Sequence, residues 1–212
     1  RYLAGLATKY PPSRLVGTDE HQGLATGFEI GTRFHSAVAV RVADARREHL
    51  GHVHRADGRW RIYAFGSGDE RDLLDFASWI GEAPDSPVAR FTPEGADIDA
   101  LFDLRGVFRC GHHDIEMNRV PEALRPRTGP LSLMDWEKVW ARDPDDDIFA
   151  ARGIDPGGAV VVVRPDQYVA HVLPLSARAE LAEFFAAVFG AASAGAADRA
   201  AGSRDAPHRP RG

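Results

Sequence analysis

The chain has 212 residues, 44% hydrophobic and 27% charged, a composition typical of one folded domain with appendages. Its formal net charge of -5, with acidic and basic side chains interleaved, excludes the basic stripe that nucleic acid or an anionic membrane needs. The first residues do not show a leader pattern and the sequence contains no run of about 18 apolar residues, so we expect a cytoplasmic protein. The single cysteine, Cys110, excludes an intrachain disulfide, a CxxC redox pair and a thiolate-rich zinc site.

The two ends of the chain differ in character from its middle. Tyr2, Leu3 and Leu6 lie at helical spacing ahead of Tyr10, which predicts the last turns of a helix whose start lies upstream. These side chains have no visible partner, so we expect a chain that starts near Gly27 to be more soluble. Residues 191–212 hold no large apolar side chain and are expected to be a disordered tail.

In the first half of the chain, a strand, a helix and a second strand follow one another. Residues 37–42 are rich in valine, and residues 60–65 follow the turn signal Ala56-Asp57-Gly58, so both are predicted strands. Residues 67–70 read as a capping box, and a helix follows with its apolar positions at helical spacing: Leu73, Phe76, Ala77 and Ile80. Residues 101–110 are a further predicted strand, after a turn at 92–95.

The strongest pattern lies late in the chain. Residues 159–163 and 168–173 are predicted to form a hairpin around Pro165 and Asp166, and the four valines in a row indicate a strand buried on both faces. A helix is then predicted from an N-cap at Ser176 to Gly190, with an apolar stripe facing Val161 and Val163: Leu181, Phe184, Phe185 and Val188. Strand, helix, strand, hairpin and helix is the order of the thioredoxin fold, an α/β fold with a central mixed sheet and flanking helices.

Two candidate motifs lie at the ends of predicted strands, one after residues 60–65 and one after residues 101–110. Gly66-Ser67-Gly68 resembles the start of a dinucleotide-binding turn, but the third glycine of that motif is replaced by Arg71, so a nucleotide site is disfavoured. A thioredoxin carries its CxxC at this point, and no sulfur is present here, which excludes thiol redox chemistry. Cys110 beside His112 lacks an orienting third group for a catalytic triad.

Histidines and carboxylates form further clusters. His49, His52 and His54 lie close together, and on a strand His52 and His54 would point to the same face of the sheet. His112 and His113 form a second cluster just before Asp114. The sequence has no HExxH motif and no pair of histidines at the i, i+4 spacing of a helix, so a metal site is disfavoured. Residues 143–147 place carboxylates at alternate positions, but Ile148 and Ile154 replace the glycine and glutamate of a calcium loop. We therefore expect a solvated acidic loop, and no catalytic, cofactor-binding or metal-binding residue in this chain.

Several longer segments resemble one family. Residues 27–37, with Gly31-Thr32-Arg33, are similar to the start of the C-terminal domain of flavin-dependent aromatic hydroxylases. Residues 56–65, 153–155 and 161–170 resemble the phenol 2-monooxygenase group, and residues 92–99 and 111–113 resemble its 3-hydroxybenzoate 4-monooxygenase branch. The likeness runs from about residue 10 to residue 189.

The resemblance implies a parent enzyme that uses FAD and NAD(P)H to hydroxylate a phenolic ring, such as 3-hydroxybenzoate or phenol, with its flavin and substrate residues upstream of this module. It implies three parts: residues 1–27 end the flavin/substrate domain and linker, residues 28–190 form a thioredoxin-like domain, and residues 191–212 form the tail. The expected role is structural support of a homodimer, packed on the upstream domain. The fragment alone would then be inactive.

Two other functions remain open at this point. The chain could be a free-standing thioredoxin-like binding module that acts with a separate flavoprotein, in which Arg164 or His113 meets the carboxylate of a small aromatic acid. An autonomous enzyme such as a hydrolase, built on the histidines and Cys110, is disfavoured because the required motifs are absent.

Overall fold

A mixed sheet forms the centre of the computed structural model, which describes residues 8–202, with side chains up to residue 190. Its strands follow the spatial order β2-β1-β7-β4-β3-β8-β9. In chain order they are β1 (Val38–Arg41), β2 (Arg46–His49), β3 (Trp60–Phe65), β4 (Phe102–Phe108), β7 (Val139–Ala141), β8 (Ala159–Val163) and β9 (Val169–Leu173).

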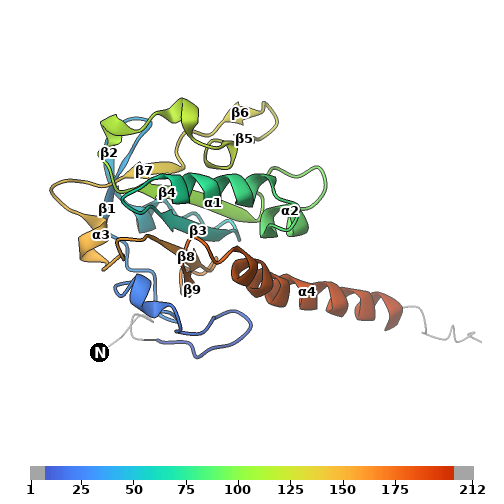
Figure 1. The fold of residues 1–212 in the computed structure, drawn as a ribbon. Helices are drawn as coiled ribbons and strands as arrows, with labels where there is room; N and C mark the ends of the chain where they lie inside the picture. The colour runs from blue at the N-terminus through green and yellow to red at the C-terminus, as the bar shows by residue number, and fades with distance from the viewer. Residues whose placement is uncertain (1–7, 203–212) are drawn as a thin grey trace, which may run out of the picture.

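Four neighbouring strands and three helices have the thioredoxin topology. β3 leads into α1 (Arg71–Glu82) and then α2 (Pro87–Phe91), and the chain returns as β4, parallel to β3. The hairpin of β8 and β9 adds antiparallel to the other side of β3, and α4 (Arg178–Gly202) follows it. Figure 1 shows α1 crossing the sheet and the far end of α4 extending away from it. The fold expected from the order of the elements is therefore confirmed.

The remaining strands extend the sheet beyond β4. β7 pairs parallel to β4, β1 pairs antiparallel to β7, and β2 forms the outer edge. The connection from β4 to β8 also carries the small hairpin of β5 (Arg127–Thr128) and β6 (Leu133–Met134), and the short helix α3 (Ile148–Ala151). It further contains three 3-10 turns, at His112–Asp114, Met117–Arg119 and Glu122–Leu124, and two more precede β3, at Gln22–Leu24 and Leu50–Val53.

The valines of β8 are buried on both faces of the sheet, as predicted. Val160 and Val162 belong to the core beneath α1 and α4, and Val161 and Val163 belong to a second core on the opposite face. Phe185 is fully buried in the first core, where its ring lies 5.3 Å from that of Trp60. The predicted contact of the α4 stripe with Val161 and Val163 is therefore wrong, because successive strand side chains point to opposite faces.

The segment before Gly27 packs on the rest of the fold. Val16 and Ala25 are buried in the second core, at 1% and 0% exposed. The ring of Tyr10 meets that of Tyr168 edge-on at 4.8 Å. The packed unit thus begins earlier than the boundary at residues 27 and 28 that the sequence suggested, while Tyr2, Leu3 and Leu6 lie outside the described residues.

The helix ends differ from the sequence patterns. Glu70 precedes α1 without a side-chain cap, and Ser67 Oγ instead accepts a bond from the amide of Asp69, so the capping box is not formed. α4 begins at Arg178, and the amide of Leu181 donates to the backbone oxygen of Ala177, so the N-cap position falls at Ala177 and not at Ser176 as predicted. The helix also continues past Gly190 into the segment expected to be disordered, of which residues 203–212 lie outside the described part.

Candidate functional site

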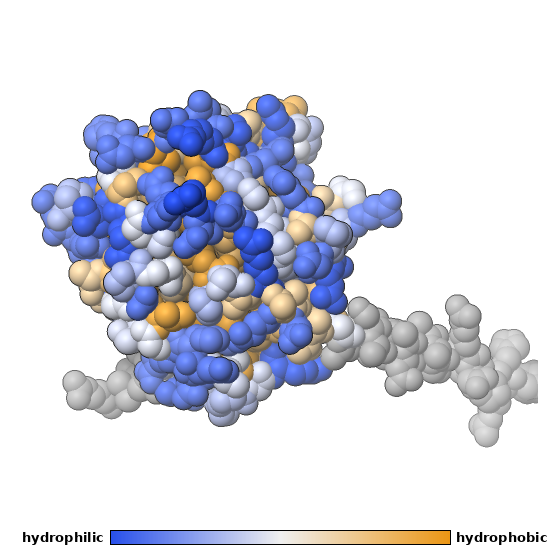
Figure 2. Space-filling view, in the orientation of Figure 1, coloured by the Kyte–Doolittle hydropathy of each residue, from blue (hydrophilic) through white to orange (hydrophobic). Residues whose placement is uncertain are grey.

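The N-terminal end of α1 borders a cleft of about 390 Å³. Two segments that the sequence left separate meet there, residues 68–71 and residues 114–120. Figure 2 shows recessed apolar surface on this face, between polar rims. The apolar lining comes from Leu74, Phe108, Ile115 and Val120, and the acidic rim from Asp69, Glu70, Asp114 and Glu116.

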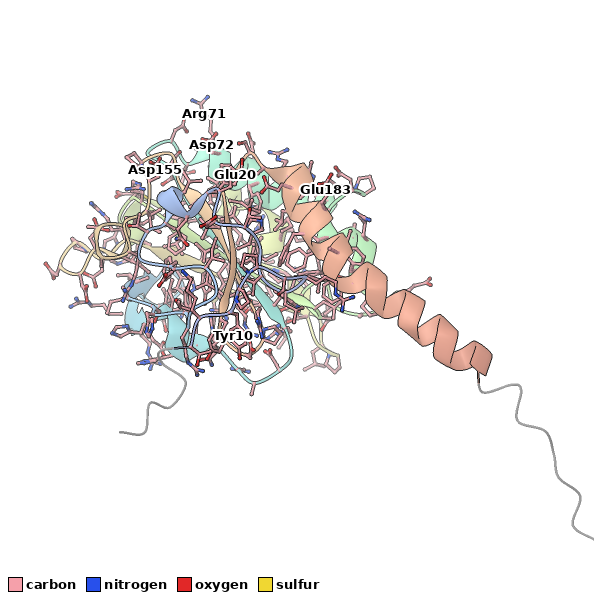
Figure 3. The ribbon with its side chains drawn as sticks, turned by 90° about the horizontal axis from the view of Figure 1, so that it is seen from below. Tyr10, Glu20, Arg71, Asp72, Asp155 and Glu183 are labelled. Atoms are coloured by element: carbon pink, nitrogen blue, oxygen red, sulfur yellow. The ribbon has the colours of Figure 1, made fainter. Side chains whose placement is uncertain are left out.

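This cleft is unsuited to the pyrophosphate of a flavin or nicotinamide nucleotide. The side chains of Arg71 and Arg119 line this cleft, but that of Arg71 is 83% exposed and paired with Asp69. Figure 3 shows Arg71 projecting away from the body of the protein. The remaining rim is mainly acidic and would repel phosphate. The rim as a whole, with four carboxylates against two arginines, therefore disfavours the pyrophosphate of FAD.

Cys110 lies beside the same cleft and is a poor nucleophile. Burial raises the pKa of its thiol to about 12, and a hydrogen bond with Glu70 adds to this effect. Only the thiolate attacks electrophiles or disulfides, so little of the reactive form is present at neutral pH. The rings of His112 and His113 lie 3.8 Å apart and are tilted by 40°, and in the described part of the chain no hydrogen bond joins His112 to Cys110.

The other histidine cluster has a structural role. His52 lies in a 3-10 turn, so the strand alternation considered for His52 and His54 is wrong. His54 Nε2 forms a short hydrogen bond with the hydroxyl of buried Tyr63, whose hydroxyl also donates to the carbonyl oxygen of Leu50. No group of three metal-ligating side chains gathers among the residues that the structure describes.

The acidic loop and Arg164 are also used in local contacts. Asp143 is only 2% exposed and pairs with Arg47, and Asp147 caps α3 by accepting a 2.9 Å bond from the amide of Phe149. The loop is thus less solvated than expected at both of its ends. Arg164 binds both oxygens of Asp166, at 3.0 and 2.6 Å, which leaves little of its guanidinium for the carboxylate of a ligand.

A buried charge cluster, which sequence reasoning missed, ties the centre of the sheet together. Lys138 Nζ lies 2.8 Å from Asp99 and 2.8 Å from Asp103, and Asp103 is fully buried. Burial by itself would raise the pKa of Asp103, but Arg105 and Lys138 hold it well below its usual range. Arg61, only 2% exposed, completes the cluster through Asp103 and Asp57. Charged side chains within otherwise apolar strands were the signal that could have revealed it.

An apolar arm is the second feature that the sequence analysis missed. The β5–β6 arm, residues 126–136, is closed at its base by a 2.8 Å bond from the amide of Asp135 to the oxygen of Pro126. Its large apolar side chains are exposed: Leu131 by 79%, Leu133 by 65% and Trp136 by 43%. The arm forms its own two-stranded sheet beside the main one, at the upper right of Figure 1. This exposure is typical of a protein-protein contact.

Comparison with known proteins places the chain in a family. The model of the phenol hydroxylase C-terminal dimerisation domain matches residues 8–193. The chain belongs to this family. It is 48% identical to 3-hydroxybenzoate 4-monooxygenase of Comamonas testosteroni over 194 residues, covering 87% of this chain and 30% of that protein. It is 31% identical to the FAD-dependent monooxygenase terD of Aspergillus terreus, covering 87% of this chain and 32% of that protein.

The chain thus spans about a third of the length of the curated relatives it matches. Among solved structures, it is similar to a putative protein disulfide isomerase from Bacteroides thetaiotaomicron, with a TM-score of 0.46 and 17% identity over 76% of this chain and 87% of that one. In the part of the chain that the structure describes, no helix is long and apolar enough to span a bilayer.

Proposed function

We propose that this chain is the C-terminal, dimer-supporting domain of an FAD- and NAD(P)H-dependent aromatic monooxygenase that acts on 3-hydroxybenzoate or a related phenol. The observation that carries the proposal is the family match over residues 8–193, which contains the whole packed unit from Val16 to Phe185. The names of the two relatives support the flavin and the class of substrate.

The proposed role is structural, in the cytoplasm, with the upstream flavin domain and a second copy as partners. The acidic cleft at α1 and the raised thiol pKa of Cys110 support the view that flavin binding and redox chemistry lie elsewhere in the parent enzyme. The side chains of this chain then hold the fold and present its surface. They are not in contact with the reacting atoms.

Sedimentation equilibrium of the 212-residue chain, followed by desalting after incubation with FAD, tests the proposal. We expect a concentration-dependent dimer and no yellow flavin absorbance in the protein fraction. A monomer at every concentration would contradict the dimerising role. A monomer that also binds 3-hydroxybenzoate in a calorimetric titration would favour the free-standing binding module, and stoichiometric retention of flavin would contradict the structural role.

A further inference from the structure

We propose that the β5–β6 arm is the surface through which this chain contacts a second copy of itself. The contact would be centred on Leu131, Leu133 and Trp136. This inference rests on the proposed dimerising function, and it adds the location of the contact on the fold.

The arm is held in place although its apolar side chains lie in solvent. Its strands have two residues each, too few for a hairpin to be stable by itself in water. The backbone is fixed by the domain instead, because the amide of Gly129 donates a 2.8 Å bond to Asp97. Arg127 Nη1 also donates to the carbonyl oxygen of Ser132 at the turn. A preformed contact element loses little conformational freedom when it binds.

Charge favours a second copy as the partner of this surface. Each chain carries a formal net charge of -5, so two copies repel each other as wholes. Residues 129–134 contain no charged side chain. Arg127 and Asp135 lie nearer the base of the arm, so two identical acidic chains can meet at residues 129–134 without placing like charges against each other. A twofold axis beside the arm would bring the same patch from each copy into contact.

The two edges of the main sheet are poor alternatives for self-association. The outer side of β9 is covered by the N-terminal segment, through bonds from Gly17 to Ala170 and from Gly31 to Val169. The opposite edge, β2, is charged along its length by Arg46, Arg47 and Glu48. Charged edge strands resist pairing with another sheet. Neither edge offers the exposed apolar surface that the arm does.

The arm alone is smaller than a complete interface, which buries about 800 Å² on each partner. We therefore expect it to be the centre of a larger contact. Interface energy concentrates in a few central side chains, and tryptophan is enriched among them. Substitution of the arm leucines should then weaken dimerisation far more than substitution of an exposed leucine elsewhere.

Sedimentation equilibrium of the full chain tests whether the arm leucines contribute to dimerisation more than an exposed leucine elsewhere does. The Leu131→Asp/Leu133→Asp variant should raise the dimer Kd at least about tenfold, because it places two charges at the centre of the contact. Leu15→Asp is the matched control, at a leucine 42% exposed outside the arm, and should leave the Kd unchanged. Thermal melts of the monomeric state should coincide for all three chains, because the arm leucines contribute little to the core.

Trp136 gives a second readout. Trp60, Trp79 and Trp140 are all at most 8% exposed, so acrylamide quenching reports mainly on Trp136. Quenching should decrease as the wild-type chain is concentrated, and this change should vanish in Trp136→Phe. If the double variant still dimerises, or if Trp136 is quenched equally in monomer and dimer, the contact does not lie at the arm, although the dimerising function is still supported. A wild-type chain that is monomeric throughout overturns the function itself.

Discussion

The backbone amide of Gly17 donates a 2.7 Å hydrogen bond to the carbonyl oxygen of Ala170 in β9. This bond covers the outer strand of the sheet with a segment far away in sequence. The approach is close enough that a Cβ on Gly17 would lie 2.6 Å from the ring of His171, which is itself only 4% exposed. The absence of a side chain at residue 17 is therefore what allows the N-terminal segment to lie against β9.

Gly17→Ala should lower the free energy of unfolding by about 1–3 kcal/mol, the usual cost of forcing an extra carbon into a filled site. Gly23→Ala is the matched control, since a Cβ there meets nothing within 4 Å. Urea unfolding followed by circular dichroism measures both. Equal midpoints for the two variants would show that the N-terminal segment is not seated against His171.

Deletion of the segment before Gly27 should destabilise the domain, contrary to the gain in solubility expected from the sequence alone. The deletion removes Val16 and Ala25 from the second core and bares the backbone of β9. An uncovered edge strand promotes aggregation. Light scattering of the trimmed chain should show aggregates beside a monodisperse full chain. If the trimmed chain is the better behaved one, the segment is not part of the packed unit.

Lys138→Met should lower the free energy of unfolding by about 1–3 kcal/mol, because Asp99 and Asp103 each lose a hydrogen bond from the ammonium group, although Asp103 stays paired with Arg105 and Arg61. Arg71→Ala breaks an ion pair at the surface instead and should leave the urea midpoint where it is. A loss of stability as small for Lys138→Met as for Arg71→Ala would mean that water reaches the charge cluster.

Stability should fall as the pH drops from 6.5 towards 4. Burial lowers the pKa of His54 from 6.5 to about 4, and Arg61 adds to this effect. The unfolded chain therefore takes up the proton first, and the neutral folded form loses up to about 3 kcal/mol across this window. Burial lowers the pKa of His171 as well, which acts in the same direction.

Urea unfolding at several pH values, with His54→Gln as the test variant, isolates this contribution. The variant should show a shallower loss of stability between pH 6.5 and 4 than the wild-type chain. His35→Gln, at an exposed position, is the control and should keep the wild-type slope. An unchanged slope in His54→Gln would place the proton uptake elsewhere.

Cys110 should react with iodoacetamide at pH 8 far more slowly in the folded chain than in urea. Burial and the hydrogen bond with Glu70 raise its thiol pKa to about 12, so the folded chain holds very little thiolate at this pH. Mass spectrometry of timed samples gives both rates. Equal rates would show that the thiol is open to solvent and that the cleft at α1 deserves a test for covalent chemistry.

Local pattern in the sequence determined the elements of the thioredoxin fold. The valine run of β8, the turn at Pro165 and the helical stripe through Phe185 each indicate their element from neighbouring residues alone. These patterns work because strand and helix periodicity reflect burial on one or two faces. They do not specify which face a distant element covers, which is why the α4 stripe was assigned to the wrong side of β8.

The tertiary structure decided what depends on contacts between residues far apart in the chain. Lys138 reads as a surface residue in the sequence, and it is buried only because β7 pairs with β4 and brings it against Asp103. Gly17 reads as part of a linker, yet it seals the edge of β9. Leucine side chains are usually buried, yet that of Leu131 is 79% exposed. Hydrophobicity sets whether burial is favourable, but only the complete packing of the chain determines which side chains find a partner.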